Sequence, residues 1–407
     1  MTEKVAQGRS NRPKLPVYLD YQATTPVDSR VLAAMVPYFT EKFGNPSSTS
    51  YSLGREAALA VEYARAQLAE IIGADPREIV FTSGATESNN LAIKGVANFA
   101  HETRRHIIAA MTEHKCVLES CRSLEEKGFR VSYLPVGRNG LIDLQRLDDE
   151  IGDDTLLVSI MAVNNEIGVI QPLTEIGALC RAKGVYFHSD AAQAIGRIPI
   201  DVDAMAVDLL SISGHKIYGP KGIGALYVRR RPRVRLEPLL SGGGQERGLR
   251  SGTLPAPLCV GIGVAAALAS AEMADEAVRL RDLRDRLYSG LKERIPDLLV
   301  NGDERRRIAG NLNVAFPGIG ADKLIENLPD LAVSTGSACT STSVEPSYVL
   351  RAMGLDDALA GASLRFGLGR FTQAAEIDYA TQAIADAVER LRLGTAEIPA
   401  RERMKDR

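Results

Sequence analysis

Between residues 78 and 230 the chain alternates between short β-rich runs and helical stretches. Several of the β-rich runs are apolar throughout instead of alternating between apolar and polar positions. Continuous apolar runs are typical of strands covered on both faces, as in a parallel sheet flanked by helices. We therefore predict a mainly parallel, seven-stranded sheet with strands at EIVFTS, HIIAAMT, RVSYLPV, TLLVSIMAV, VYFHSD, DLLSISG and GALYVRR.

The pattern changes in an Ala-rich helical tract that begins at Leu258 and continues to Arg294. Shorter strands at LLVNG, NLNVAFP and SLRFGLG follow, interleaved with helices at ADKLIENL, SYVLRAM and 374–393. This order predicts an α/β protein with a second, smaller α+β domain at its C-terminal end. The expected parts are a mobile N-terminal segment (1–16), a large domain (17–270) whose first residues can pack on the small one, the small domain (271–393) and a polar tail (394–407).

Composition limits which partners the protein can bind and indicates the cellular compartment in which it works. The 407 residues carry 49 basic and 51 acidic side chains, so the formal net charge of -2 offers no footprint for nucleic acid. No uninterrupted apolar run reaches the roughly 18 residues of a membrane span, and the N-terminal residues form no secretory signal. Five cysteines without a CxxC pattern suit a reducing compartment, so we expect a cytoplasmic protein.

Lys216 follows the apolar run DLLSISG and lies in the Gly-rich stretch GHKIYGPKGIG. Ligands of parallel sheets bind beyond the carboxyl ends of the strands, which is where this lysine lies. An amine among apolar neighbours loses its proton more readily, and a neutral amine can form a Schiff base with an aldehyde cofactor. The alternative is a loop lysine held in water.

Asp190 and Gln193 close another strand, FHSDAAQ, and their spacing permits two interpretations. One is a helix capping box. The other is a carboxylate that keeps a pyridine nitrogen protonated, with Gln193 donating to the phenolic oxygen of the same ring.

The turn TSGATES after a third strand is rich in small hydroxyl-bearing residues and leads into a helix. Its free amides and the helix dipole favour an anion, although ordinary helix capping explains the same residues. Thr86, Ser213 and His215 can together hold a phosphate. The loop SGGGQERGLRSGT (241–253) is either a flexible linker or a segment that approaches a ligand or a neighbouring subunit.

Cys339 lies in a loop of small residues, 334–343, with almost no apolar neighbours to bury it. We expect an exposed, mobile thiol there, whereas Cys180 and Cys259 lie in apolar helices as inert core residues. Other motifs are weak. Gly261-Ile262-Gly263 only imitates a dinucleotide-binding fingerprint, because it lies inside the Ala-rich helix and does not follow a strand. The two histidines of HETRRH are wrongly spaced for a zinc site, so no metal site is predicted.

Taken in order, these segments resemble the cysteine desulfurases, pyridoxal-phosphate (PLP) enzymes of the class V aminotransferase family with fold type I. The resemblance covers nearly the whole chain. It is carried by YLDYQATTP, GNPS, TSGATESNN, TEHK, VNNEIGV, FHSDAAQ, SGHKIYGPKGIG, GGGQERGLRSGT, SGSACTS, EPSY and LRF.

The resemblance implies a role for each matching residue. Lys216 would form the Schiff base and Cys339 would take the sulfur as a persulfide, while His114 would stack on the cofactor ring and move protons near the thiols. Arg365 would bind the substrate carboxylate and Asn165 would position cofactor and substrate. The implied cofactor contacts are Asp190 to the pyridine nitrogen, Gln193 to the phenolic oxygen, and Ala85, Thr86, Ser213 and His215 to the phosphate, joined by Thr253 of the partner subunit of a homodimer.

The implied activity is conversion of L-cysteine to L-alanine, with sulfur passed to an acceptor protein for iron–sulfur cluster assembly, tRNA thiolation or another thio-cofactor. The acceptor is an iron–sulfur scaffold or a sulfur carrier. Relatives that serve scaffolds carry an aromatic and acidic C-terminal extension, whereas this chain ends in ARERMKDR. The competing functions are a selenocysteine lyase, an aminotransferase, or a cofactor-bearing scaffold without turnover.

Overall fold

The computed structural model describes residues 13–100, 104–336 and 345–396, and its centre is a seven-stranded sheet. The strand order is β2-β8-β7-β6-β5-β3-β4. Only β8 runs antiparallel to its neighbours, so the prediction of a mainly parallel sheet is confirmed. The strands are β2 (Ile79–Thr82), β3 (His106–Ala110), β4 (Arg130–Leu134), β5 (Thr155–Ser159), β6 (Tyr186–Asp190), β7 (Leu209–Ser213) and β8 (Gly224–Val228).

Both faces of this sheet are buried, which explains its continuous apolar strands. In β2, Ile79 and Phe81 join one hydrophobic core while Val80 joins another. The core beside Val80 is closed by α4 (Ala85–Ala100) and α5 (Lys115–Glu125). The opposite core contains residues of α1 (Ser29–Met35), α3 (Ser52–Glu70), α6 (Leu144–Glu150) and α7 (Leu173–Lys183), and α2 (Pro37–Thr40) lies next to α1.

The smaller domain has an antiparallel sheet in the order β12-β10-β9 and a third hydrophobic core. Val17–Tyr18 (β1) pairs with Leu331–Ala332 (β11), so the first described residues pack on this domain. The terminal helix ends at Ala396, three residues later than predicted; residues 1–12 and 397–407 lie outside the described chain. The remaining elements are β9 (Leu299–Val300), β10 (Asn311–Ala315), β12 (Ser363–Gly367), α9 (Ala321–Glu326), α10 (Tyr348–Ala352), α11 (Asp357–Gly361) and α12 (Ala374–Ala396).

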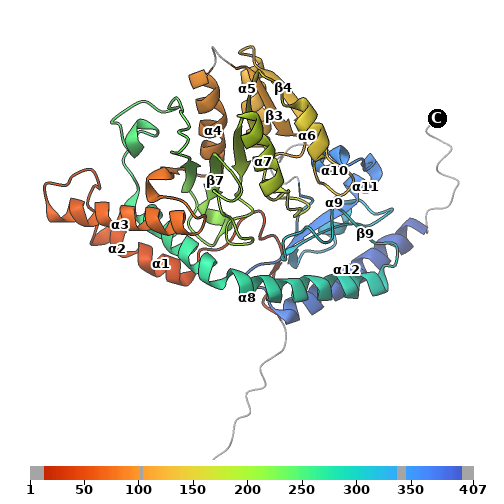
Figure 1. The fold of residues 1–407 in the computed structure, drawn as a ribbon. Coiled ribbons are helices and arrows are strands. Elements are labelled where there is room, and N and C mark those ends of the chain that lie inside the picture. The colour runs from red at the N-terminus through yellow and green to blue at the C-terminus, as the bar shows by residue number, and fades with distance from the viewer. Residues whose placement is uncertain (1–12, 101–103, 337–344, 397–407) are drawn as a thin grey trace, which may run out of the picture.

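One long helix, α8 (Ala256–Arg294), connects the two domains (Figure 1). Its first part contributes to the large core and its last part, Leu280–Leu291, to the small one. The predicted boundary at residue 270 therefore falls inside a continuous helix. Within the described residues, α8 is the one helix whose length and composition would allow it to cross a membrane, and half of its apolar window is buried inside the protein.

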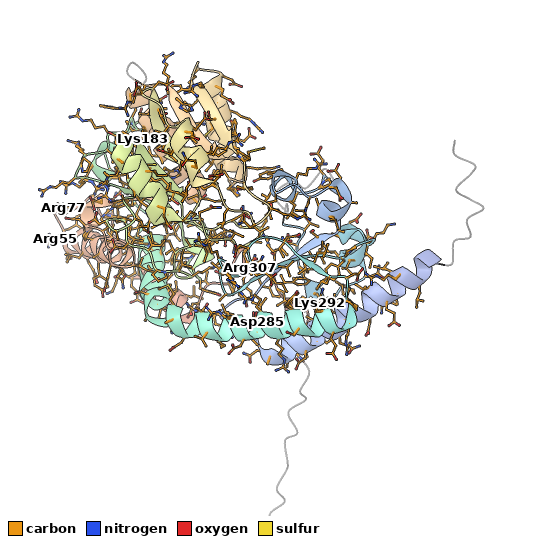
Figure 2. All side chains as sticks on the ribbon, turned by 45° about the vertical axis from the view of Figure 1, so that its right-hand side comes forward. Arg55, Arg77, Lys183, Asp285, Lys292 and Arg307 are labelled. Atoms are coloured by element: carbon orange, nitrogen blue, oxygen red, sulfur yellow. The ribbon has the colours of Figure 1, made fainter. Side chains whose placement is uncertain are left out.

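A polar junction fixes the small domain against the large one. Asn311 and Asn313 of β10 each donate a side-chain hydrogen bond of 3.2 Å to the carbonyl oxygen of Glu166. Val169 forms a bridge with Arg307, which lies in the middle of the molecule in Figure 2. These contacts position Asn165 and β12 at the same cavity.

Candidate active site

A cavity of about 560 Å³ opens at the carboxyl ends of β6 and β7. The structure brings ten of the predicted site residues together in its wall. Cys339 lies outside the described residues, and Thr253 is exposed and does not line the cavity of its own chain. The ten are Ala85, Thr86, His114, Asn165, Asp190, Gln193, Ser213, His215, Lys216 and Arg365.

Lys216 reaches the cavity through a single 3₁₀ turn, Gly214–Lys216, that directly follows β7. Its Nζ donates hydrogen bonds of 2.6 Å to the carbonyl oxygens of Gln22 and Ala23. The amine is therefore held at the cavity wall, and the alternative of a loop lysine held in water is wrong.

Asp190 is only 4% exposed at the end of β6. Its Oδ1 accepts a 2.9 Å hydrogen bond from the amide of Ala192, and its Oδ2 accepts one of 2.6 Å from Asn89 Nδ2. The chain after β6 forms turns and no α-helix, so the capping-box interpretation is wrong. The Nε2 of Gln193 donates 2.8 Å to the carbonyl oxygen of Gln22.

His114 precedes α5 as its N-cap, and its Nδ1 accepts a 3.3 Å hydrogen bond from the amide of Cys116. Because a backbone amide only donates, the proton of a neutral His114 ring is on Nε2. The Cys116 Sγ lies 3.0 Å from the same Nδ1 and 3.1 Å from Asn89 Nδ2.

Sequence reasoning missed Asn89 and left Cys116 undecided. Asn89 is a buried polar residue inside α4, where nothing in the sequence indicates its partner. Cys116 follows His114 by two residues, a spacing that indicates proximity without giving the direction of either side chain.

The residues predicted to hold a phosphate lie together at one end of the cavity, here called the anion corner. They are Ala85 and Thr86 at the start of α4, Ser213 at the end of β7 and His215 just after it. His215 Nδ1 lies 3.0 Å from Thr24 Oγ1. Burial, followed by the charges of Lys216 and Lys221, lowers the pKa of His215 to about 4. The ring is therefore neutral at pH 7, and the corner's positive charge comes from lysines and the helix dipole.

Arg365 is 3% exposed in β12, and two of its nitrogens are already engaged. Nη2 donates 2.6 Å to Asp20 Oδ1, and Nη1 donates 2.8 Å to the carbonyl oxygen of Asn165. Within the described chain, Arg365 Nε and Asn165 Oδ1 are buried without a hydrogen-bond partner. Burial raises the pKa of Asp20, a residue that sequence reasoning quoted in a motif without giving it a role, although Arg365 opposes the shift.

The other three described cysteines differ from Cys116, which is only partly buried. Cys121, Cys180 and Cys259 are buried, and burial raises the pKa of each thiol to about 12. The expectation that Cys180 and Cys259 are core residues is confirmed.

Comparison with known proteins agrees with this geometry. Residues 17–380 match the family model described as aminotransferase class-V. The chain belongs to the aminotransferase class-V family. Class-V relatives from Rickettsia peacockii and Rickettsia bellii, both named cysteine desulfurase IscS, are 59% identical over 382 and 378 residues, with 94% and 93% of this chain and 93% and 92% of the relative covered.

Solved structures support the same assignment. A NifS-like protein superposes with a TM-score of 0.86 at 39% identity, covering 92% of this chain and 99% of the other. A structure titled SspA in complex with cysteine superposes with a TM-score of 0.78 at 41% identity, covering 86% and 98%.

Proposed function

We propose that this class-V protein is a PLP-dependent cysteine desulfurase that converts L-cysteine to L-alanine and passes the sulfur on as a persulfide of Cys339. The observation that carries the proposal is the single cavity in which Lys216, Asp190, His114 and Arg365 meet. The relatives named cysteine desulfurase support it, because they match over nearly their whole length.

The cavity fits PLP in size and in the placement of its polar groups. Its volume of about 560 Å³ lies within the usual range for small-molecule sites. Lys216 supplies an amine for the aldehyde, and Asp190, held by two donors, supplies a carboxylate for the pyridine nitrogen. Ser213, His215 and the start of α4 supply the anion corner, and Asn165 lines the same cavity.

Bound in this cavity, PLP would supply an aldehyde that captures the substrate amine and an electron sink that weakens the bonds at Cα. The released Lys216 amine would then remove the Cα proton. Arg365, which lines the cavity, would bind the substrate carboxylate with its guanidinium, using Nη2 if Asp20 gives up its contact. A planar guanidinium suits a carboxylate because it can donate two parallel hydrogen bonds.

The persulfide step is assigned to Cys339, which lies outside the described residues. Gly336, the last described residue before it, lines the cavity. Three residues of chain span at most about 11 Å, a reach that would allow the Cys339 thiol to approach a substrate in the cavity. His114, whose Nδ1 accepts from the Cys116 amide, would exchange protons with the thiols through its Nε2.

The proposal also covers the sulfur acceptor, the cellular compartment and the oligomeric state. The sulfur acceptor is an iron–sulfur scaffold or sulfur-carrier protein, the compartment is the cytoplasm, and the enzyme is a homodimer. Thr253 is exposed and does not line the cavity of its own chain, which supports its use in the site of a partner subunit.

The deciding assay incubates the purified protein with L-cysteine and a thiol reductant and measures alanine and sulfide. Equal amounts of both products are expected. Formation of a keto acid would favour an aminotransferase, and turnover restricted to L-selenocysteine would favour a selenocysteine lyase. A protein that binds PLP but turns over none of these substrates would be the scaffold.

A further inference from the structure

The anion corner of the cavity contains a carboxylate. Glu87 lines the cavity beside Ser83, Ala85 and Thr86, and its Oε2 accepts a 2.7 Å hydrogen bond from the amide of Ser83. Glu87 therefore occupies the Ser83 amide, two residues before α4, and adds a negative charge where a phosphate is expected. Two negative charges placed close together in a partly buried site repel each other.

Arg250 lies against this carboxylate. Its Nε donates a 2.9 Å hydrogen bond to Glu87 Oε1, and the two side chains are only 20% and 18% exposed. Although burial raises the pKa of Glu87, hydrogen bonds from Arg250 and Ser83 lower it below its ordinary value. Glu87 thus stays charged at neutral pH, and Arg250 is the cation that balances it.

The loop carrying Arg250 is fixed by a second ion pair. Arg65 Nη1 and Nη2 donate hydrogen bonds of 2.8 and 2.7 Å to the two carboxylate oxygens of Glu246. Glu246 Oε2 also accepts 2.7 Å from the amide of Phe81 in β2. Both side chains of this pair are almost fully buried, so the loop is anchored to the strand that leads into the anion corner.

We propose that Arg250 is a positioning residue for the phosphate group of the cofactor, because it neutralises Glu87 and so allows the corner to accept a second anion. The proposal rests on the cofactor assignment made above. It gives the Gly-rich loop a role at the site of its own chain, in addition to the predicted role of Thr253 in the site of a partner.

The test compares PLP with pyridoxal, which lacks the phosphate, by titration into the full-length protein freed of cofactor. Arg250→Ala is expected to raise the dissociation constant of PLP by about 10- to 100-fold, the range of a charge-assisted hydrogen bond, and to leave that of pyridoxal unchanged. Adding Glu87→Gln to Arg250→Ala is expected to recover most of the loss, because the uncompensated charge is then absent.

Arg77→Ala is the matched control, because it removes one positive charge from a surface pair with Asp75 at the outer edge of the molecule (Figure 2). If Arg250→Ala raises the dissociation constant of pyridoxal as much as that of PLP, or if the double variant binds PLP no more tightly than Arg250→Ala, the loop has only a structural role and the proposal fails.

Should Arg250→Ala not fold, the single variants Arg250→Lys and Glu87→Gln replace it. Both must then bind PLP at least nearly as tightly as the wild type, and a large loss in either would overturn the proposal. Failure of desulfuration with intact PLP binding would contradict the proposed function alone.

Discussion

At the scale of single residues, the reactive side chains are held by neighbours that are not themselves reactive. Asn89 donates to Asp190 Oδ2 and lies next to Cys116, which in turn contacts His114. The groups expected at the pyridine nitrogen and above the ring are therefore connected through one buried amide. Arg365 is oriented similarly, by Asp20.

Cys339→Ser is the residue-scale prediction for the sulfur step. A hydroxyl is a poor nucleophile toward sulfur at neutral pH, so release of alanine and sulfide from L-cysteine should fall by at least about 100-fold. PLP content, measured by absorbance, should match the wild type because Cys339 is not assigned to cofactor binding. Cys180→Ser is the matched control, because it makes the same substitution at a buried thiol outside the site. If it folds, it should release alanine and sulfide at the wild-type rate. Loss of bound PLP in Cys339→Ser would instead indicate a structural role.

At the scale of elements, the contact between α3 and α8 depends on the small residues of the Ala-rich tract. A Cβ added at Gly263 would lie 2.6 Å from Ala64 Cα and 2.7 Å from Ala64 Cβ. The glycines that imitate a dinucleotide motif in the sequence therefore serve close helix packing.

Gly263→Ala should destabilise the protein even though alanine is the better helix former. The propensity gain is about 1 kcal/mol, whereas overpacking against a backbone costs about 1–3 kcal/mol. We expect the free energy of unfolding, from chemical denaturation, to fall by up to about 2 kcal/mol. Gly394→Ala in α12, where an added Cβ meets nothing within 4 Å, should not destabilise. A stability gain in Gly263→Ala would show that the helices can separate without cost.

His188 in β6 contacts the strands on both sides of it, and its burial predicts that the stability of the fold depends on pH. Its ring lies 2.8 Å from Ser159 Oγ of β5 and 3.1 Å from Ser211 Oγ of β7. Complete burial lowers its pKa to about 3, so the folded protein keeps the ring neutral while the unfolded chain protonates it near pH 6.5. The unfolded state thus binds the extra proton, and stability is lost as the pH falls from about 6.5 toward 3.

Between pH 7 and pH 5 this group alone should lower the free energy of unfolding by about 2 kcal/mol. The measurement is denaturant unfolding of wild type and His188→Gln at both pH values. The variant is expected to be less stable at pH 7 but to lose less on acidification. An equal loss in both proteins would mean that His188 does not set this dependence.

At the scale of the whole molecule, the cavity is built from both domains and is proposed to be completed by a second chain. The large domain supplies Lys216 and Asp190, the small domain supplies Arg365, and Thr253 is exposed and does not line the cavity. This arrangement predicts that each active site needs residues from two subunits.

Mixing two inactive variants tests this prediction. In a heterodimer of Lys216→Ala and Thr253→Val chains, one of the two sites combines an intact Lys216 with the intact Thr253 of the partner subunit. Random exchange makes half the dimers mixed, so about a quarter of the wild-type sites should return. Activity is measured after co-refolding, with each variant alone as the control. If mixing gives only the average of the two parents, Thr253 acts within its own chain.

Much of the site was predictable because parallel strands place their carboxyl ends at one edge. Lys216, Asp190 and Thr86 each follow such a strand, so their convergence follows from strand type alone. Asn89 and Arg250 were not predictable as partners of Asp190 and Glu87, because each pair joins residues 101 or 163 positions apart. The short strands β1 and β11 were also missed, since two-residue runs carry no periodic signal.

Local periodicity and strand ends depend on neighbouring positions. The amino-acid pattern alone therefore placed the strands along the chain, the layers on both faces of the sheet and the residues able to carry amine, carboxylate and imidazole chemistry. Which polar groups meet became known from the folded structure: Asp190 with Asn89, Arg365 with Asp20, and Glu87 with Arg250. Those pairings depend on side-chain directions across the fold, which no local pattern records.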